Sequence, residues 1–515
     1  MTSVPTHRSR QFRFAALGII LLTVAIRLPS LLHPLPIDDE AGYSVIANEI
    51  VDGGRPYIDA VDRKPPLLFW TYAAAFKVAG EYNWIALHIL SLIWTLATMA
   101  GLYVIAKQLF DRETGLIAAL FYSVFQPWAS FKNLAFNGEM VMNLAIVWAW
   151  AIGFKRNSLK WRPELLGAGA LLCAAFLLKQ PAAIAAIPLG IYLLLPSYRI
   201  SRGLTRTQSV VHAATFTAGF FGSFALFAVF LQGEGIFRET VYWTIVANTI
   251  PYIFWKKGML MTLAFVGACL PLVIGVAAAI RDSRGLWAGK RGEQTALLGL
   301  LAASAIGTAA GARFYEHYYI QLIPPLSLLA APYYVQLWTG RMQSRYWLLR
   351  PSLAYAWLAA TIVAFSISHW LGAARRAPSE TGRYLLEHSA PNDRIFVWGN
   401  KPKFYIEAQR RPACRYILSF PLTGYIFGEP PGFDTHSRIV SGAWTMLEQD
   451  FEKHPPAYIV DLSSEPGALD PVRDFPILAK LLAERYQPVA RTAEGVIYHR
   501  NDSPVVAHHS PKSNR

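Results

Sequence analysis

Two short stretches of the chain contain residue types that suit acid–base chemistry next to a phosphate. The first is the acidic run 38–40, Asp-Asp-Glu, and the second is the run 62–64, Asp-Arg-Lys. A carboxylate can act as a general base toward a hydroxyl group, and a lysine ammonium can hold a phosphate. We therefore take Asp39 as the candidate base and Lys64 as the candidate ligand of a lipid phosphate.

The same residues also have simpler structural interpretations. Asp38 or Asp39 could cap the helix that is expected to begin near Ala41, and Lys64 could extend to the level of the lipid headgroups. Three adjacent acids beside a membrane are costly unless they are solvated or used in chemistry. Taken alone, these residues leave both interpretations open.

The composition is typical of a membrane protein with many spans. Hydrophobic residues make up 54% of the 515 residues, which is too many for an ordinary soluble enzyme. The net charge of +15 is consistent with a nucleic-acid partner, but the basic residues fall in short loops between apolar runs. That distribution follows the positive-inside pattern of membrane proteins and argues against nucleic-acid binding. The three cysteines include no pair of the zinc-binding type.

The apolar runs predict about eleven transmembrane helices. Basic residues are more frequent in the segments that we place inside than in the outer loops, although the outer loops are longer in total. This places a short N-terminal tail, 1–13, in the cytoplasm and the C-terminal region outside. The expected spans are residues 14–32, 84–106, 115–128, 140–154, 164–179, 182–196, 209–231, 259–280, 295–311, 318–338 and 352–371.

The long loop 33–83 lies between the first two spans and contains both candidate runs. A short interfacial helix is expected over 41–51, because Tyr43, Ala47 and Ile50 recur at helical spacing. Two consecutive prolines interrupt regular structure before residue 67. The apolar run 67–78 that follows is expected to form a second interfacial helix or a re-entrant piece. The loop is therefore expected to hold its charged residues between two helices on the outer face.

The chain changes character after the last span. We assign residues 14–375 to the transmembrane domain, 376–500 to a small extracytoplasmic α/β domain, and 501–515 to a disordered polar tail. Short strands are expected at 394–398, 457–461, 486–489 and 495–499. The predicted fold class is an α-helical polytopic membrane protein with a small C-terminal α/β domain.

Several motifs together resemble the GT-C glycosyltransferases. The run 39–43, Asp-Glu-Ala-Gly-Tyr, followed by 62–67, Asp-Arg-Lys-Pro-Pro-Leu, is similar to the first outer loop of one branch of that superfamily. The branch contains dolichyl-phosphate-mannose–protein mannosyltransferase-like and aminoarabinose-transferase-like proteins. The resemblance covers roughly residues 10–370, and the C-terminal domain has no matching motif. Later motifs of the same family correspond in order to 137–139, 179–180 and 317–325.

This resemblance implies an inverting glycosyltransferase with the GT-C fold. Such an enzyme takes a sugar, mannose-like by family, from a polyprenyl-phosphate carrier. It passes the sugar to a protein, lipid or glycan acceptor on the outer side of the cell membrane. The donor and the membrane lipid are the expected partners. Because a sugar phosphate is a good leaving group, cations that stabilise the departing phosphate would be sufficient.

The resemblance also implies roles for single residues. The catalytic acid of the family corresponds to Asp39, with Glu40 beside it, and the second acidic position corresponds to Glu139. The additional Asp38 leaves open which carboxylate acts as the base. The sequence fixes no metal-ligand set, so a divalent cation stays an open option, and no other cofactor is expected. The expected donor-phosphate ligands are Lys64, Arg63, Lys179 and His317, and the expected ligands of the acceptor or sugar are Asn137, Tyr43 and Asp62.

The later motif residues have structural alternatives as well. Glu139 could be a solvated acid that favours the start of a helix, and Lys179 could extend to the headgroups. His317 lies among tyrosines that would suit an aromatic belt at the membrane interface. These alternatives stand beside the catalytic interpretation.

Two other functions compete with a transferase. A transporter or flippase of lipid-linked sugars would place paired charges within its spans and often contain two related halves. The sequence shows acids in outer loops and no internal repeat. A non-catalytic assembly protein with a degenerate scaffold is the third option, and the presence of Asp39, Lys64 and Glu139 argues against it.

Overall fold

The computed structural model describes residues 7–37, 39–156, 159–248, 253–282, 285–340, 351–425, 435–464 and 471–503. Its contacts divide the chain into two compact units. The first, which we call the helical unit, comprises Met1–Pro34, Leu87–Glu234 and Thr249–Arg375. The second, which we call the mixed unit, comprises Leu35–Ala86, Gly235–Asn248 and Arg376–Arg515.

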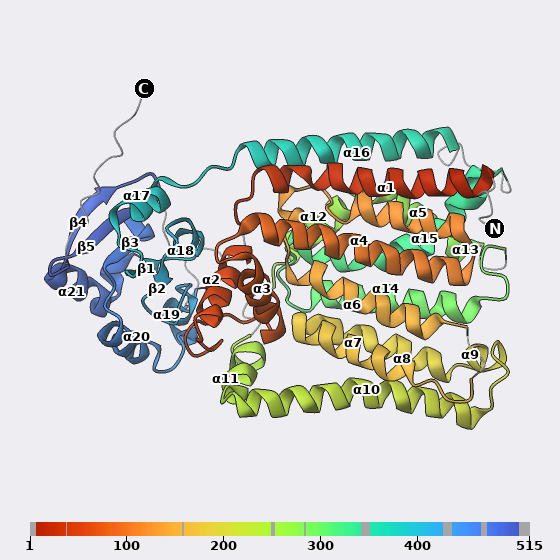
Figure 1. Cartoon of the computed structure of the whole chain (residues 1–515), viewed down its shortest axis with the longest axis horizontal. Coiled ribbons are helices and arrows are strands. Elements are labelled where there is room, and N and C mark those ends of the chain that lie inside the picture. Colours follow the sequence, from red (N-terminus) through yellow and green to blue (C-terminus); the bar gives the residue numbers. More distant parts are fainter. Residues whose placement is uncertain are drawn as a thin grey trace, which may run out of the picture. The chain divides into compact units, whose positions relative to one another are not determined.

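The helical unit consists of helices that lie side by side (Figure 1). Their sequences are apolar over most of their length, so packing among these helices buries the apolar side chains. The α-helices are α1 (His7–Leu32), α4 (Trp84–Leu109), α5 (Arg112–Phe125), α6 (Gly138–Phe154), α7 (Glu164–Leu178), α8 (Ala186–Leu194), α9 (Pro196–Ile200), α10 (Arg206–Gly233), α12 (Trp255–Ala268), α13 (Leu270–Arg281), α14 (Arg291–Ala309), α15 (Ile323–Trp338) and α16 (Pro351–Ala374). Three 3-10 helices join them, η1 (Phe131–Leu134), η2 (Gln180–Ala185) and η4 (Glu316–Leu322).

Four helices of the described chain are long and apolar enough to cross a membrane by themselves. They are Arg10–Leu32 within α1, α4, α10 and Tyr355–Ala374 within α16. The bent pair of α12 and α13 would make a fifth span. Several of the other expected spans correspond to shorter apolar helices, including α6 and α7. The count of eleven spans therefore stays a prediction.

The span expected over 259–280 is not one straight helix. Helices α12 and α13 meet at an angle of 82°. Pro271 occupies the start of α13, where its missing N–H is tolerated, but a proline in that place interrupts a helix that would otherwise continue. Cys269 follows the last residue of α12, and its N–H donates a hydrogen bond of 2.8 Å to the carbonyl of Phe265. The bend follows from this proline.

The mixed unit contains both helices that the sequence predicts in the first outer loop. They are α2 (Asp39–Val51) and α3 (Pro66–Ala79), and α3 starts directly after Pro65. The middle segment of the unit forms α11 (Phe237–Val241) and a π-helical turn, η3 (Tyr242–Val246). The C-terminal part adds α17 (Glu380–His388), α18 (Lys403–Glu407), α19 (Phe420–Thr423), α20 (Ala443–Lys453) and α21 (Pro476–Arg485), with short 3-10 turns η6 (His436–Arg438), η7 (Leu462–Ser464) and η8 (Val472–Asp474).

The C-terminal part is built on a mixed five-stranded sheet. The strands are β1 (Arg394–Trp398), β2 (Arg411–Pro412), β3 (Tyr458–Asp461), β4 (Tyr486–Arg491) and β5 (Val496–Arg500), in the order β2-β1-β3-β5-β4. β1 is parallel to β2 and β3, whereas β5 is antiparallel to β3 and β4. The paired residues Phe396 and Ile459 are both buried. The expected α/β domain is confirmed, and β2 is an additional strand.

Ion pairs hold the loop 33–83 against this sheet. The Nη2 atom of Arg411 in β2 lies 2.5 Å from Asp52 Oδ2 and 2.6 Å from Glu81 Oε2. Asp52 follows α2 and Glu81 follows α3. Arg394 of β1 lies 3.5 Å from Glu49 of α2. The acidic loop, which the sequence analysis assigns to the transmembrane domain, therefore forms one compact unit with the C-terminal sheet.

Candidate functional site

Asp39 is the first residue of α2, and its side chain is half-buried. Its Oδ2 atom accepts a hydrogen bond of 3.1 Å from the hydroxyl of Tyr43, one helical turn later. Tyr43 itself is buried, so its ring is fixed in place. The arrangement orients the Asp39 carboxylate while leaving part of it accessible. Asp38, the alternative base, lies outside the described residues.

Glu40 is fully buried beside Asp39. Its Oε2 atom accepts a hydrogen bond of 2.8 Å from the backbone N–H of Ile37, three residues earlier in the chain. Burial, and then the nearby Glu40 and Asp39 charges, raise the pKa of Tyr72 far above its usual range. Tyr72 is thus a neutral phenol near both acids. These contacts give Glu40 a structural task at the start of the helix.

The side chain of Lys64 lies over the ring of the same tyrosine, Tyr43. Its ammonium nitrogen is 5.8 Å from the centroid of the Tyr43 ring, a cation–π arrangement. The loop that carries Lys64 is fixed by Tyr57, whose hydroxyl donates to the Lys64 carbonyl at 2.6 Å. Tyr57 has a φ angle of +68°, which is unusual for a residue other than glycine and marks a tightly constrained turn. Tyr43 therefore contacts the candidate base through its hydroxyl and the candidate phosphate ligand through its ring.

The other two residues of the second run lie on either side of this turn. The guanidinium carbon of Arg63 is 4.3 Å from the centroid of the Phe420 ring, which belongs to the C-terminal part of the mixed unit. Asp62 is buried and accepts a short hydrogen bond from the Arg63 N–H. A Cβ atom on Gly42 would lie 3.8 Å from Asp62 Oδ2, so α2 and this turn are in contact. The two motifs are adjacent in space.

The sequence analysis missed the contribution of the C-terminal domain to this loop. The N–H of Val61 donates to the carbonyl of Arg415 at 2.9 Å. Trp243 is buried, with its ring 6.5 Å from that of Tyr416 and 6.3 Å from that of Phe420. The only available signal was the pair of aromatic residues Tyr416 and Phe420, and no motif linked them to the loop. The C-terminal domain thus supports the turn that carries Arg63 and Lys64.

A second group of expected site residues lies in the helical unit. Glu139, in the first turn of α6, places its Oε1 atom 2.9 Å from Lys179 Nζ, and both side chains are buried, with 2% and 7% exposure. Asn137 caps α6 by accepting a hydrogen bond of 3.2 Å from the N–H of Met140. A Cβ atom on Gly138 would lie 2.9 Å from Lys179 Cδ, so the glycine gives the lysine its path to Glu139.

His317 joins the same group. Lys179 Nζ lies 5.1 Å from the ring centroid of Tyr318, and the His317 ring lies 4.8 Å from the same tyrosine. The 3-10 helix η4 that carries both residues is held by Asn143, whose amide donates to the Ile320 carbonyl at 3.2 Å. The motif residues at 137–139, 179 and 317 are therefore brought together from three distant parts of the sequence.

The geometry rules out two of the simpler interpretations. Glu139 is not a solvated acid, and Lys179 does not extend to the headgroups, because the two form a buried ion pair. Asp39 and Glu139 belong to different units. Within the described ranges, no group of three His, Cys, Asp or Glu residues could hold a metal ion. The catalytic and ligand roles of these residues stay predictions.

Comparisons with known proteins agree with this architecture. The family model described as dolichyl-phosphate-mannose-protein mannosyltransferase matches residues 63–221. The crystal structure of ArnT from Cupriavidus metallidurans in the apo state superposes with a TM-score of 0.59 at 12% identity, covering 94% of this chain and 98% of that one. The chain has the GT-C fold. This confirms the fold class that the GT-C resemblance of the motifs implied.

Two further GT-C structures show the same fold. ArnT from Cupriavidus metallidurans bound to undecaprenyl phosphate matches with a TM-score of 0.58 at 12% identity, covering 96% of this chain and 98% of that one. The oligosaccharyltransferase of Archaeoglobus fulgidus, tethered with an acceptor peptide, matches with a TM-score of 0.54 at 14% identity, covering 96% and 74%. No curated protein sequence matches the chain.

Proposed function

We propose that the chain is a glycosyltransferase that moves a sugar from a polyprenyl phosphate to an acceptor hydroxyl. The family model and the GT-C fold support this reaction class. ArnT has been crystallised with undecaprenyl phosphate, and the archaeal oligosaccharyltransferase AglB has been solved with an inhibitory peptide and a dolichol-phosphate. The observation that carries the proposal is the placement of Asp39 and Lys64 on the two sides of Tyr43.

In the proposed reaction, Asp39 accepts the proton of the acceptor hydroxyl. The hydroxyl oxygen forms a bond to the anomeric carbon, and the bond from that carbon to the phosphate oxygen breaks with inversion. The phosphate leaves with the bonding electrons, and Lys64 stabilises its growing charge. The products are the glycosylated acceptor, polyprenyl phosphate and a protonated Asp39. Arg63, held on Phe420, supplies a second cation from the same turn.

The remaining residues hold the proposed base and the proposed phosphate ligands in place. Glu40 fixes the start of α2, and the Tyr43 hydroxyl orients the base. In the helical unit, the ion pair with Glu139 fixes the buried Lys179. Contacts of Lys179 and His317 with the donor phosphate stay predictions. Contacts of Asn137 and Asp62 with the sugar or acceptor stay predictions.

We also propose a class of sugar, a class of acceptor and a location for the enzyme. The sugar is mannose-like by the description of the family model, and the acceptor is a protein, a lipid or a glycan. We place the enzyme in the cell membrane, with the mixed unit on the outer side. Lys64 and Arg63 supply cationic charge to the phosphate, so the reaction as proposed is complete without a metal. Chelation of divalent cations should therefore leave the release of polyprenyl phosphate by the wild type unchanged, and a loss of release would show that a metal is required.

The decisive experiment compares the full-length protein with two variants in nanodiscs. A panel of labelled polyprenyl-phosphate sugars is supplied with acceptor extracts, and the release of polyprenyl phosphate is measured. We expect one sugar to be transferred by the wild type and Asp39→Asn to lower turnover about 100-fold or more, because the general base is lost. Asp59→Asn is the matched control, since Asp59 lies in the same loop and bonds to the Arg55 N–H at 2.8 Å. Full activity of Asp39→Asn would refute the assignment.

A further inference from the structure

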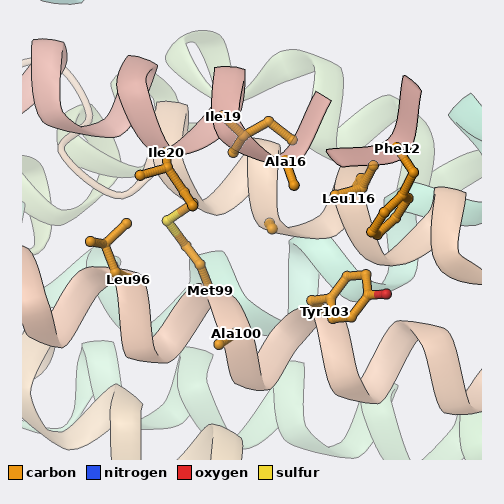
Figure 2. Close-up of a pocket in the computed structure, with 10 residues that line it drawn as sticks. Phe12, Ala16, Ile19, Ile20, Leu96, Met99, Ala100, Tyr103 and Leu116 are labelled. Carbon is orange, nitrogen blue, oxygen red and sulfur yellow. The ribbon is translucent and has the colours of Figure 1, made fainter. Parts of the chain in front are cut away.

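The helical unit contains an apolar cavity of about 290 Å³ between α1, α4 and α5 (Figure 2). Its walls include Ala16 and Ile20 of α1, Met99 and Ala100 of α4, and Leu116 of α5. Ile20 is 43% exposed, so the cavity is accessible from the surface of the unit. A pocket lined in this way suits an alkyl chain and offers almost nothing to a polar ligand.

One end of the cavity is different. Phe12 and Tyr103 line it there, with ring centroids 6.1 Å apart. Each ring has a cation beside it, because the guanidinium carbon of Arg112 is 5.9 Å from the Phe12 centroid and Lys107 Nζ is 5.9 Å from the Tyr103 centroid. Both cationic side chains are exposed. The apolar cavity therefore ends at two positive charges that can reach a ligand from solvent.

Basic residues outnumber acidic residues in the sequence near this end of the cavity. Arg10 and Arg13 flank Phe12 on α1, and their side chains are exposed. Two acids lie nearby in sequence. The carboxylate of Asp111 caps α5 by accepting 2.8 Å hydrogen bonds from the N–H and the hydroxyl of Thr114, and Glu113 follows in the first turn of the helix. Near this end in the sequence there are therefore four cations and two acids, and one of the acids is already used as a cap.

We propose that this cavity binds one acyl chain of an anionic glycerophospholipid, with the lipid phosphate held by Lys107 and Arg112. From Phe12 to Ile20 the cavity extends for about 12 Å along α1. That length is close to one leaflet, which is about half of the ~30 Å hydrocarbon core. A single acyl chain would fill the cavity, whereas a long polyprenyl chain would extend well beyond it.

The expected orientation of the chain agrees with this ligand. The positive-inside pattern places the end with Phe12 at the cytoplasmic leaflet, whose anionic lipids attract basic side chains next to a span. Each Lys or Arg near such a surface strengthens binding about fivefold. The charge of the headgroup, and not only the apolar chain, should therefore determine which lipid the cavity retains.

The test is lipid retention by the full-length protein. The protein is purified from nanodiscs made of equal parts phosphatidylglycerol and phosphatidylcholine, and the bound lipids are counted by native mass spectrometry. We expect phosphatidylglycerol to be retained preferentially. Lys107→Gln and Arg112→Gln should each lower its retention about fivefold and leave phosphatidylcholine unchanged. Arg206→Gln, which removes an exposed cation at the start of α10, is the control and should change neither.

A second variant tests the cavity itself. Ala100→Phe would fill the space between α1 and α4 and should lower retention of both lipids. If Ala100→Phe does not fold, Lys107→Gln and Arg112→Gln still test the proposal. Equal retention of the two lipids, retention of neither, or charge variants that behave like Arg206→Gln would overturn the proposal. Displacement of phosphatidylglycerol by an equal concentration of undecaprenyl phosphate would also overturn it, because the cavity would then belong to the donor lipid.

Discussion

The two groups of candidate residues hold their charges in different ways. In the mixed unit, Asp39 and Lys64 are half-buried, and each contacts the same neutral residue, Tyr43. In the helical unit, Glu139 and Lys179 are buried and neutralise one another directly. A half-buried charge can exchange a proton or bind a phosphate, whereas a buried pair is costly to break. The first group is therefore suited to react and the second to hold a fixed geometry.

The largest expected effect comes from breaking the buried pair. Lys179→Ala leaves Glu139 buried without its ion-pair partner, so we expect the free energy of unfolding to fall by about 3–5 kcal/mol. Asp39→Asn should change it by less than about 0.5 kcal/mol, because its side chain is half-buried and the amide oxygen can still accept from Tyr43. Thermal unfolding in detergent measures both. Equal losses in the two variants would contradict the distinction between the groups.

A double variant separates stability from donor binding in the same pair. Lys179→Met combined with Glu139→Gln removes both charges, and we expect most of the lost stability to return. Transfer activity should stay low if Lys179 also contacts the donor phosphate. Recovery of both properties would show that the pair is only structural.

Removal of the half-buried Lys64 side chain should lower the affinity for the donor and leave the stability of the fold nearly unchanged. Lys64→Ala deletes a charge-assisted contact with the phosphate, which predicts a loss of donor affinity of about 10- to 100-fold. Stability should change little, because a cation–π contact at a partly exposed site contributes only about 0.5–1 kcal/mol. Donor binding is measured directly with a labelled polyprenyl-phosphate sugar. Lys77→Ala, at an exposed position on α3, is the control. Similar affinities for the two variants would remove Lys64 from the phosphate site.

A smaller effect is expected from the residue that joins the two charges. Tyr43→Phe keeps the ring beside Lys64 and removes only the 3.1 Å hydrogen bond to Asp39. One such bond contributes about 1 kcal/mol, so turnover should fall about fivefold while donor affinity is kept. Tyr458→Phe also removes one hydroxyl, which donates to the His388 carbonyl at 2.6 Å, and should leave turnover unchanged. A loss of donor affinity in Tyr43→Phe would mean that the hydroxyl acts on the phosphate.

The sequence could predict the elements of both groups but not their contacts. Helical periodicity located α2, and the apolar run after two prolines located α3. The motif order located Glu139, Lys179 and His317, because these signals are local or follow a family pattern. Pairing between residues 139 and 179 depends on how α6 and α7 pack, which no local signal encodes. The support of Val61 by Arg415 depends in the same way on how the C-terminal part of the mixed unit packs against the loop. By contrast, Pro271 was a visible signal for the bend between α12 and α13.

The smallest expected effect concerns another buried carboxylate of the mixed unit, Glu49. Glu49 is only 6% exposed, and its partner Arg394 is 3.5 Å away, farther than the 2.9 Å between Glu139 and Lys179. Burial raises the pKa of Glu49, and the charges of Arg394 and Arg411 only partly oppose that shift. The folded chain therefore keeps this proton to a higher pH than the unfolded chain does. Between the usual pKa of 4.5 and the raised value, stability must fall as the pH rises.

Glu49→Gln removes this proton and should flatten the dependence of stability on pH in that window. The difference in slope between wild type and variant cannot exceed about 1.4 kcal/mol per pH unit, the limit for one proton. Thermal unfolding from pH 4.5 to pH 7 measures it, and Glu448→Gln, at an exposed position on α20, is the control. A steeper fall in Glu49→Gln, or the same slope in all three proteins, would mean that Arg394 fully compensates the buried charge. The ion pair that joins α2 to the sheet would then resemble the one between Glu139 and Lys179.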